Sequence, residues 1–251
     1  MPLIETEGLI LKTYNLAEAD KIVLLLTREH GIVRGVAKGA KRLKSRFGSS
    51  LEPFTVVRAT YFQKETQELV SIQKLDLIGS YFTVASDPDF LQKFAYLTEI
   101  LVDSLPPQDP NETLYRMTRA CLDAAAKLPD RLDAIGFYFE VWLLRLTGYL
   151  PQWSACTICG REFSENEPAG LGVDQKLVCG KCRRLSSMAA IGPRERSTLA
   201  NALKFAPTEF AEREHGVYLR ELSDVFKRTI SQSLGRPVTE SRALAVESKA
   251  R

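Results

Sequence analysis

Residues 21–37 read KIVLLLTREHGIVRGVA and contain two short apolar runs on either side of a turn. The first run covers residues 21–26, and the second covers residues 32–37. Residues 27–31, TREHG, lie between them and end in a glycine, as hairpin turns often do. Short apolar runs joined by such a turn are typical of a β-hairpin. We therefore predict a hairpin here and work outward from it.

Three further stretches among the first 80 residues have strand character. Residues 4–12 alternate loosely, residues 54–62 are rich in β-branched and aromatic side chains, and residues 68–78 mix apolar and polar positions. Five strands in a segment of this length suit a small closed barrel, because closure removes exposed sheet edges. The leading candidate is a five-stranded oligonucleotide-binding (OB) barrel. An SH3-like barrel is the rival, and strand count alone does not separate the two.

After the strands, the sequence changes to helical periodicity. Asp87 and Pro88 are typical of a helix start, and Pro106 with Pro107 ends the apolar pattern that follows. The further helices predicted by apolar spacing cover residues 111–128, 132–146, 193–203 and 210–234. The segment 132–146 is apolar on nearly every side, so it should be the central buried helix.

Four of the five cysteines form two C-x-x-C pairs, Cys156 with Cys159 and Cys179 with Cys182. Their spacing lies in the range of a zinc site, since each turn can point two thiolates at one metal ion. A four-thiolate shell leaves no open coordination position, so we expect one structural Zn²⁺ per chain. Disulfides and idle thiols are the alternatives, and a reducing cytosol argues against disulfides. Cys121 lies on an apolar helical face and should be a core residue.

These patterns together predict an α+β fold. Residues 1–80 should form the five-stranded OB-fold barrel, and residues 81–235 an all-α helical domain with an embedded four-cysteine zinc module at about 153–185. The polar tail, residues 236–251, is expected to be disordered. Among 251 residues, 45% are hydrophobic and 26% are charged, which excludes a wholly disordered chain.

The net charge is only +3, but the basic residues are unevenly distributed. The segment 34–46 carries six basic side chains and no acidic one, and it contains glycines that suggest an exposed loop. Such a loop can track phosphate groups, or it can merely be solvated. Its basic residues are Arg34, Lys38, Lys41, Arg42, Lys44 and Arg46.

Motifs for catalysis and for membrane insertion are missing from the sequence. It has no phosphate-binding P-loop, no G-x-S-x-G, no H-E-x-x-H and no dinucleotide fingerprint. Its two histidines, His30 and His215, stand outside any motif. We therefore expect a binding protein and not an enzyme. No apolar run approaches the ~18 residues of a membrane span, and the first residues do not look like a secretory signal.

Two stretches of the chain resemble the bacterial recombination mediator family RecO. Residues 37–54 contain AKGAKR, KSRFG and LEPF in this order, and residues 147–160 contain TGYLP followed by CTICG. The order of the parts, a barrel followed by a helical body with a zinc module, also matches that family. The resemblance extends from about residue 5 to residue 234.

The resemblance implies a DNA repair and recombination mediator. Such a protein binds single- and double-stranded DNA and anneals complementary strands. With its partner RecR it helps RecA load onto DNA coated by single-stranded-DNA-binding protein (SSB), whose acidic C-terminal tail it contacts. A cytoplasmic, nucleoid-associated location follows. An RNA- or transcription-associated barrel and zinc module without mediator activity remains the alternative.

In this context the basic residues of segment 34–46 become the candidate DNA-binding residues, because cations beside a barrel groove can follow a phosphate backbone. Phe47 and Tyr14 are each either base-stacking residues or core residues. Arg183 and Arg184 are candidates for a second DNA surface, or they neutralise the zinc thiolates.

Overall fold

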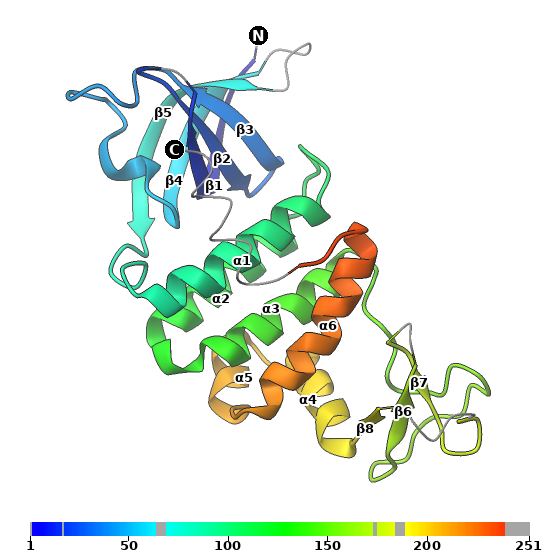
Figure 1. The fold of residues 1–251 in the computed structure, drawn as a ribbon. Helices are drawn as coiled ribbons and strands as arrows, with labels where there is room; N and C mark the ends of the chain where they lie inside the picture. Colours follow the sequence, from blue (N-terminus) through cyan, green and yellow to red (C-terminus); the bar gives the residue numbers. More distant parts are fainter. Residues whose placement is uncertain (1, 17, 64–68, 173–174, 184–188, 239–251) are drawn as a thin grey trace. The chain divides into compact units, whose positions relative to one another are not determined.

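The computed structural model describes residues 2–16, 18–63, 69–172, 175–183 and 189–238, shown in Figure 1. They divide into two compact units, one up to Leu122 and the other from Asp123. The expected disorder of the tail lies, from residue 239, outside the described residues. Among the described residues, none of the helices combines the length and the apolar character that a membrane span needs.

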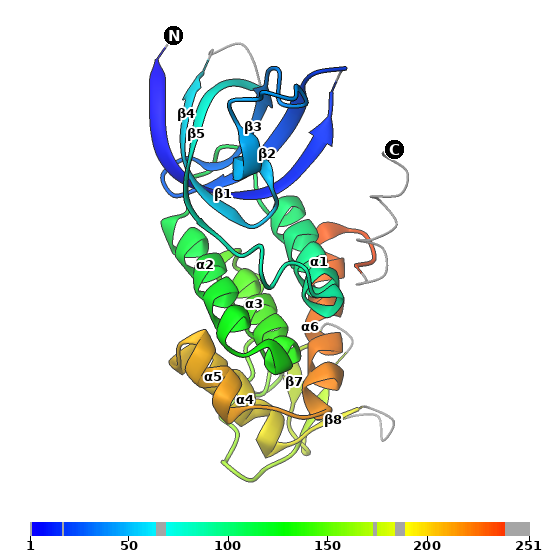
Figure 2. The same cartoon turned by 90° about the vertical axis from the view of Figure 1, so that its left-hand side faces the viewer.

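The first unit begins with a closed five-stranded barrel (Figures 1 and 2). The order around it is β1-β2-β3-β5-β4, and β1 closes it by pairing with both β2 and β4. Among the described barrel strands, β3 and β5 alone pair in parallel, at Gly35 with Val70 and Val36 with Ser71. This connectivity confirms the predicted OB fold. The strands are β1 Leu3–Asn15, β2 Lys21–Thr27, β3 Gly31–Ala37, β4 Thr55–Phe62 and β5 Val70–Ser80.

Side chains that alternate between the inner and outer faces of the strands build the barrel core. On β2, Val23 and Leu25 face inward, and Val33 of β3 meets them. The segment between β3 and β4 also contributes, because Phe47, directly before the short 3-10 helix η1 (Gly48–Leu51), and Leu51, its last residue, enter the same core. The core therefore fixes both the strands and the second half of the β3–β4 connection.

Two helices, α1 (Pro88–Ser104) and α2 (Glu112–Lys127), follow the barrel. Asp87 caps α1, since its Oδ1 accepts a hydrogen bond from the Phe90 backbone N–H at 2.9 Å. Phe90 and Phe94 of α1 pack edge-on against Phe54, directly before β4, with ring centroids 5.7 and 5.8 Å from its ring. Phe54 has φ +61°, so packing holds an aromatic residue in a left-handed conformation.

A polar network joins α2 to β1. Glu7 Oε1 accepts hydrogen bonds from the Tyr115 hydroxyl at 2.8 Å and from Arg119 Nη1 at 2.6 Å. The first compact unit therefore includes α1 and the part of α2 up to Leu122. The limits expected from the sequence, 1–80 and 81–235, follow the change from strands to helices and stay a prediction.

The second unit is a helical bundle around α3 (Leu132–Leu146). This helix is buried on most sides and packs against α4, α5 and α6, as predicted for the central helix (Figure 1). Phe137 shows this, because its ring contacts both Phe210 and Phe226. The other elements are η2 Pro129–Arg131, β6 Ala169–Leu171, β7 Leu177–Val178, β8 Ala190–Ile191, α4 Pro193–Lys204, α5 Pro207–Arg213 and α6 Tyr218–Leu234.

The single helix predicted over residues 210–234 is wrong. Helix α5 ends at Arg213, and α6 starts at Tyr218. Gly216 between them has φ +124°, which no right-handed helix contains. The break lets Phe210 and Phe226 approach Phe137 from two different helices.

Gly31, at the hairpin turn, should tolerate no side chain. Its φ is +63°, and a Cβ there would lie 2.1 Å from the Asp109 carbonyl oxygen in the α1–α2 connection. We expect Gly31→Ala to lower the free energy of unfolding by roughly 3 kcal/mol or more. The alanine would hold a strained positive φ, and the backbone at Asp109 would have to move away from its Cβ.

Gly48→Ala is the matched control in urea unfolding. Gly48 also has a positive φ, +49°, but no atom of the described residues lies within 4 Å of the Cβ position. It should cost only about 1 kcal/mol. Equal effects of the two substitutions would contradict the contact between the hairpin turn and the α1–α2 connection.

Candidate nucleic-acid interface and metal centre

Residues 38–46, here called the basic loop, leave the barrel after β3. The loop is held at both ends, because Ala40 packs against the barrel core and Phe47, directly after the loop, is 2% exposed within it. Its backbone is also tied to the β1–β2 connection. The Lys41 N–H donates to the Ala19 carbonyl at 2.9 Å, and the Gly39 N–H donates to Asp20 Oδ1 at 2.8 Å. The loop is therefore an anchored protrusion of the barrel.

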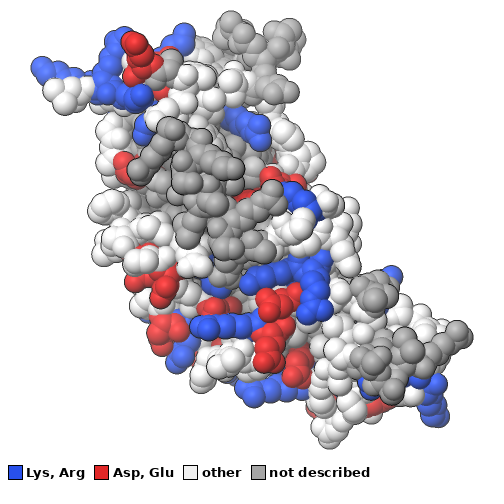
Figure 3. Space-filling view, viewed as in Figure 1, with Lys and Arg blue, Asp and Glu red and all other residues white. Residues whose placement is uncertain are grey.

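All six basic residues singled out in the sequence are exposed, and Figure 3 shows Lys and Arg gathered on the projecting loop. Arg34 lies on β3 with three residues between it and the loop, so about 13 Å of extended chain separates it from Lys38. Arg46 is partly fixed by the barrel, since its guanidinium lies over the Phe47 ring at 5.0 Å and donates to the Ile72 carbonyl at 3.5 Å. The five basic residues on the loop are Lys38, Lys41, Arg42, Lys44 and Arg46.

Strand register adds a cation that the sequence did not reveal. Lys12 of β1 pairs with Leu24 of β2, which pairs with Arg34 of β3, so all three side chains belong to one face. Only the pairing register identifies Lys12 as a neighbour of Arg34, and that register depends on the closed barrel. Tyr14, two residues along, is 38% exposed with the Lys12 ammonium 5.6 Å from its ring centroid. It stays a candidate for base stacking, whereas the stacking interpretation of Phe47 is wrong because that ring is in the core.

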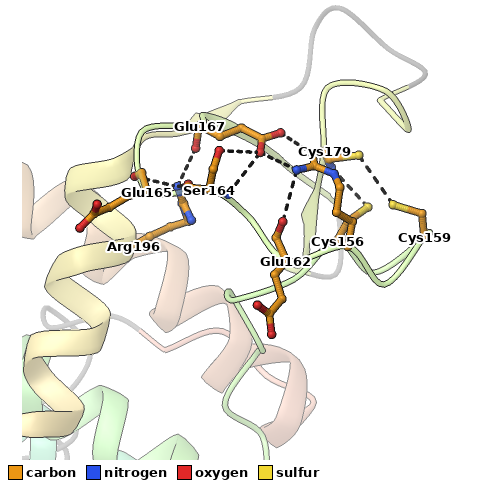
Figure 4. Close-up of polar contacts among 9 residues, drawn as sticks. Cys156, Cys159, Glu162, Ser164, Glu165, Glu167, Cys179 and Arg196 are labelled. Carbon is orange, nitrogen blue, oxygen red and sulfur yellow. Dashed lines mark hydrogen bonds and ion pairs between the residues drawn. The ribbon is translucent and has the colours of Figure 1, made fainter.

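The four paired cysteines converge in the segment between α3 and α4. Figure 4 shows three of them, Cys156, Cys159 and Cys179. Cys156 and Cys159 lie on a turn before the small sheet β7-β6-β8, and Cys179 and Cys182 lie on a turn after β7. Their Sγ atoms all lie within 4.8 Å of one another, and none of them forms a disulfide. A tetrahedral site with metal–sulfur bonds of about 2.3 Å needs sulfurs about 3.8 Å apart. The set can therefore hold one metal ion.

Hydrogen bonds favour the thiolate forms of Cys156 and Cys179 but disfavour that of Cys182. Desolvation raises the pKa of Cys156, but backbone N–H groups of Cys179, Cys159 and Ile158 together outweigh it and lower the pKa to about 6. Desolvation also raises the pKa of Cys179. Hydrogen bonds outweigh it, among them one from the Cys182 backbone N–H, and the pKa of Cys179 is lowered. Hydrogen bonds to Cys159 and Cys179 raise the pKa of Cys182 to about 12. Thiolates are the form that binds metal, and a metal cation would offset their mutual repulsion.

Two arginines and a tryptophan fix the module that holds the cysteines. Arg161 pairs with Glu167 through Nη1 and Oε2 at 2.8 Å. Arg196, from α4, donates to three carbonyl oxygens of the loop before β6 (Figure 4). Trp153 packs against Phe226 of α6, with ring centroids 5.1 Å apart. The helical bundle therefore holds the metal module in a set orientation.

The structure describes only part of the proposed second basic surface. Arg183 is half-buried after the last cysteine, and Arg184 lies outside the described residues. Cys121 is confirmed as a core residue, since it is fully buried and burial raises the pKa of its thiol. It takes no part in the cysteine cluster.

Comparison with known proteins agrees with the two parts of the chain. Residues 1–81 match the family model "Recombination protein O N terminal", and residues 86–242 match "Recombination protein O C terminal". The DNA repair protein RecO of Koribacter versatilis is 36% identical over 183 residues, which cover 73% of this chain and 74% of the relative. That of Geobacter metallireducens is 30% identical over 236 residues, 93% of each chain. With an OB barrel, a helical bundle and matches over nearly its whole length, the chain belongs to the RecO family of DNA repair and recombination proteins.

Proposed function

We propose that this chain is a recombination mediator that binds single- and double-stranded DNA through the basic loop and Arg34. It anneals complementary strands and, with RecR, helps RecA load onto DNA coated by SSB. The observation that carries the proposal is the basic loop itself, which presents five exposed cations from an anchored protrusion of an OB barrel. Membership of the RecO family supports the repair role.

The DNA interaction is electrostatic in this proposal. Each lysine or arginine that neutralises a phosphate releases condensed counterions, which makes binding strongly dependent on salt. Annealing needs no catalytic side chain, because two polyanions approach more readily when a basic surface lowers their repulsion. We therefore assign the basic loop a binding role and assign no catalytic residue.

The cysteine cluster is proposed to hold one structural Zn²⁺. Four thiolates complete a tetrahedral zinc shell and leave no position for water or substrate. The four Sγ atoms lie close enough for that shell, and the surrounding N–H donors favour the thiolate forms of Cys156 and Cys179. The ion would crosslink the two C-x-x-C turns and thereby fix the small sheet between α3 and α4.

Strand annealing tests the mediator proposal. Two complementary oligonucleotides, each coated with the cognate SSB, are mixed with and without this chain in the absence of nucleotide. We expect the chain to accelerate duplex formation. A log–log salt slope near −4 is expected for the DNA affinity if about six phosphates of single-stranded DNA are contacted.

The same experiment includes two discriminating arms. Matched RNA strands should anneal no faster than DNA strands, and a strong preference for RNA would favour the transcription-associated alternative. In a parallel reaction that contains ATP, addition of the chain together with RecR should shorten the lag before RecA covers SSB-coated DNA. Intact DNA binding without annealing and without any effect on RecA would contradict the mediator role.

A further inference from the structure

Leu43 is an apolar side chain wholly exposed to water within the basic loop. Its relative exposure is 103%, which is the largest among the exposed large hydrophobic residues of the described chain. Single apolar residues on a surface are common and need no explanation by themselves. Leu43 differs by its position, because Arg42 and Lys44 flank it directly and both are exposed.

The loop backbone holds Leu43 away from the barrel. The Arg42 N–H donates to the Gly39 carbonyl at 3.1 Å, and the Ser45 N–H donates to the Arg42 carbonyl at 2.9 Å, so two turns frame the residue. Two other apolar residues of this segment do contact the barrel core, since Ala40 packs on the core and Phe47 lies in it. Leu43 therefore sits on an anchored tip and points into solvent.

A polyanion drawn to these cations would meet an apolar group at the centre of the contact. Proteins that bind the minor groove of duplex DNA insert leucine and similar side chains between base steps, where the side chain leaves water and the bases partly unstack. We propose that Leu43 inserts between adjacent bases of single-stranded DNA bound by the basic loop. This inference rests on the proposed function, since the loop must first bind DNA.

The wedge would serve annealing directly. Stacked bases already expose their pairing edges, so the wedge acts by opening the stack at one step and letting the bases there turn toward a second strand. The cations beside Leu43 neutralise the phosphates on either side of that step, which lowers the cost of bending the backbone. An anionic membrane surface would also attract an apolar residue among cations. The OB barrel beneath the loop favours nucleic acid, and the membrane is an outcome of the test.

Leu43→Ser and Lys44→Ser form a matched pair, since both remove one exposed side chain from the same turn. Affinity for a single-stranded oligonucleotide containing 2-aminopurine is measured across a range of salt concentrations. Leu43→Ser should bind about 10-fold more weakly at every salt concentration with an unchanged salt slope, because it loses apolar burial and no phosphate contact. It should also lose the rise in 2-aminopurine fluorescence that unstacking produces. Lys44→Ser should instead reduce the slope by about 0.7 and keep that rise.

Leu43→Trp gives a direct reading of insertion. The natural tryptophans, Trp142 and Trp153, both lie in the second unit, so a new signal from the loop is separable in a difference measurement. We expect its emission to be quenched by single-stranded DNA. A response to phosphatidylserine vesicles and none to DNA would overturn the wedge in favour of a membrane contact.

The failures are distinguishable. Wild-type affinity and fluorescence in Leu43→Ser, together with weak binding when the loop charges are reversed, would overturn the wedge alone. Unchanged DNA binding after charge reversal would overturn the proposed DNA-binding role of the loop, and the wedge with it. Thermal unfolding of each variant checks that the barrel is intact, which is expected for a side chain without packing contacts.

Discussion

Simultaneous replacement of Lys41, Arg42 and Lys44 by Glu should weaken binding to single-stranded DNA by at least about 100-fold at about 0.1 M salt. Each lost phosphate contact lowers the salt slope by about 0.7, and three contacts correspond to two orders of magnitude at that concentration. The new carboxylates add repulsion. Strand annealing should become undetectable, and salt-dependent binding titrations would measure both the affinity and the slope.

This substitution also reverses the net charge of the chain from +3 to −3, so its control must change charge equally. Arg116, Lys127 and Arg228 are exposed and lie outside the basic loop and its barrel. Their joint replacement by Glu should reduce binding far less if the loop is the contact. A folded loop variant that anneals as the wild type does would refute the assignment of DNA binding to the basic loop.

Loss of one cysteine ligand is the second large effect expected. The purified chain should contain about one zinc ion, and Cys156→Ser and Cys182→Ser should each lose most of it. Because structural zinc sites contribute folding free energy directly, several kcal/mol should be lost, which corresponds to a fall in Tm on the order of 10 °C. Metal content by mass spectrometry and thermal unfolding followed through Trp153, which packs beside the module, measure both effects.

Cys121→Ser separates metal loss from simple destabilisation. Cys121 is completely buried and stands outside the cluster, so its replacement should lower stability while the zinc content stays at one per chain. A metal-free wild-type preparation with the Tm of the metal-loaded protein would rule out a structural role for the ion. Zinc retained in both ligand variants would rule out the proposed ligand set.

Local patterns in the sequence predicted most of the fold. The hairpin at residues 21–37 and the central helix α3 depend on nearest neighbours along the chain, and both are confirmed. The cysteine cluster was predictable for the same reason, since each C-x-x-C turn is local and only two turns must meet. The break at Gly216 was missed because the segments on either side have helical composition, and their packing on α3 selects two helices instead of one.

Distant pairing was beyond the sequence. The choice between two barrels depends on the pairing of β1 with β4 and of β3 with β5, which strand count does not contain. Phe47, an aromatic residue beside cations, resembles a base-stacking residue until the barrel core encloses it. The alignment of Lys12 with Arg34 depends on the register of three strands.

The packing of Phe54 against Phe90 and Phe94 of α1 determines where the chain can be divided. The first family model ends at residue 81, but a fragment ending there would lack Phe90, Phe94 and the partners of Glu7. It would present the Phe54 ring to water on a backbone that its packing no longer holds. The segment matched by the first family model and the segment expected to fold alone thus differ, and an autonomous amino-terminal piece should extend to Leu122.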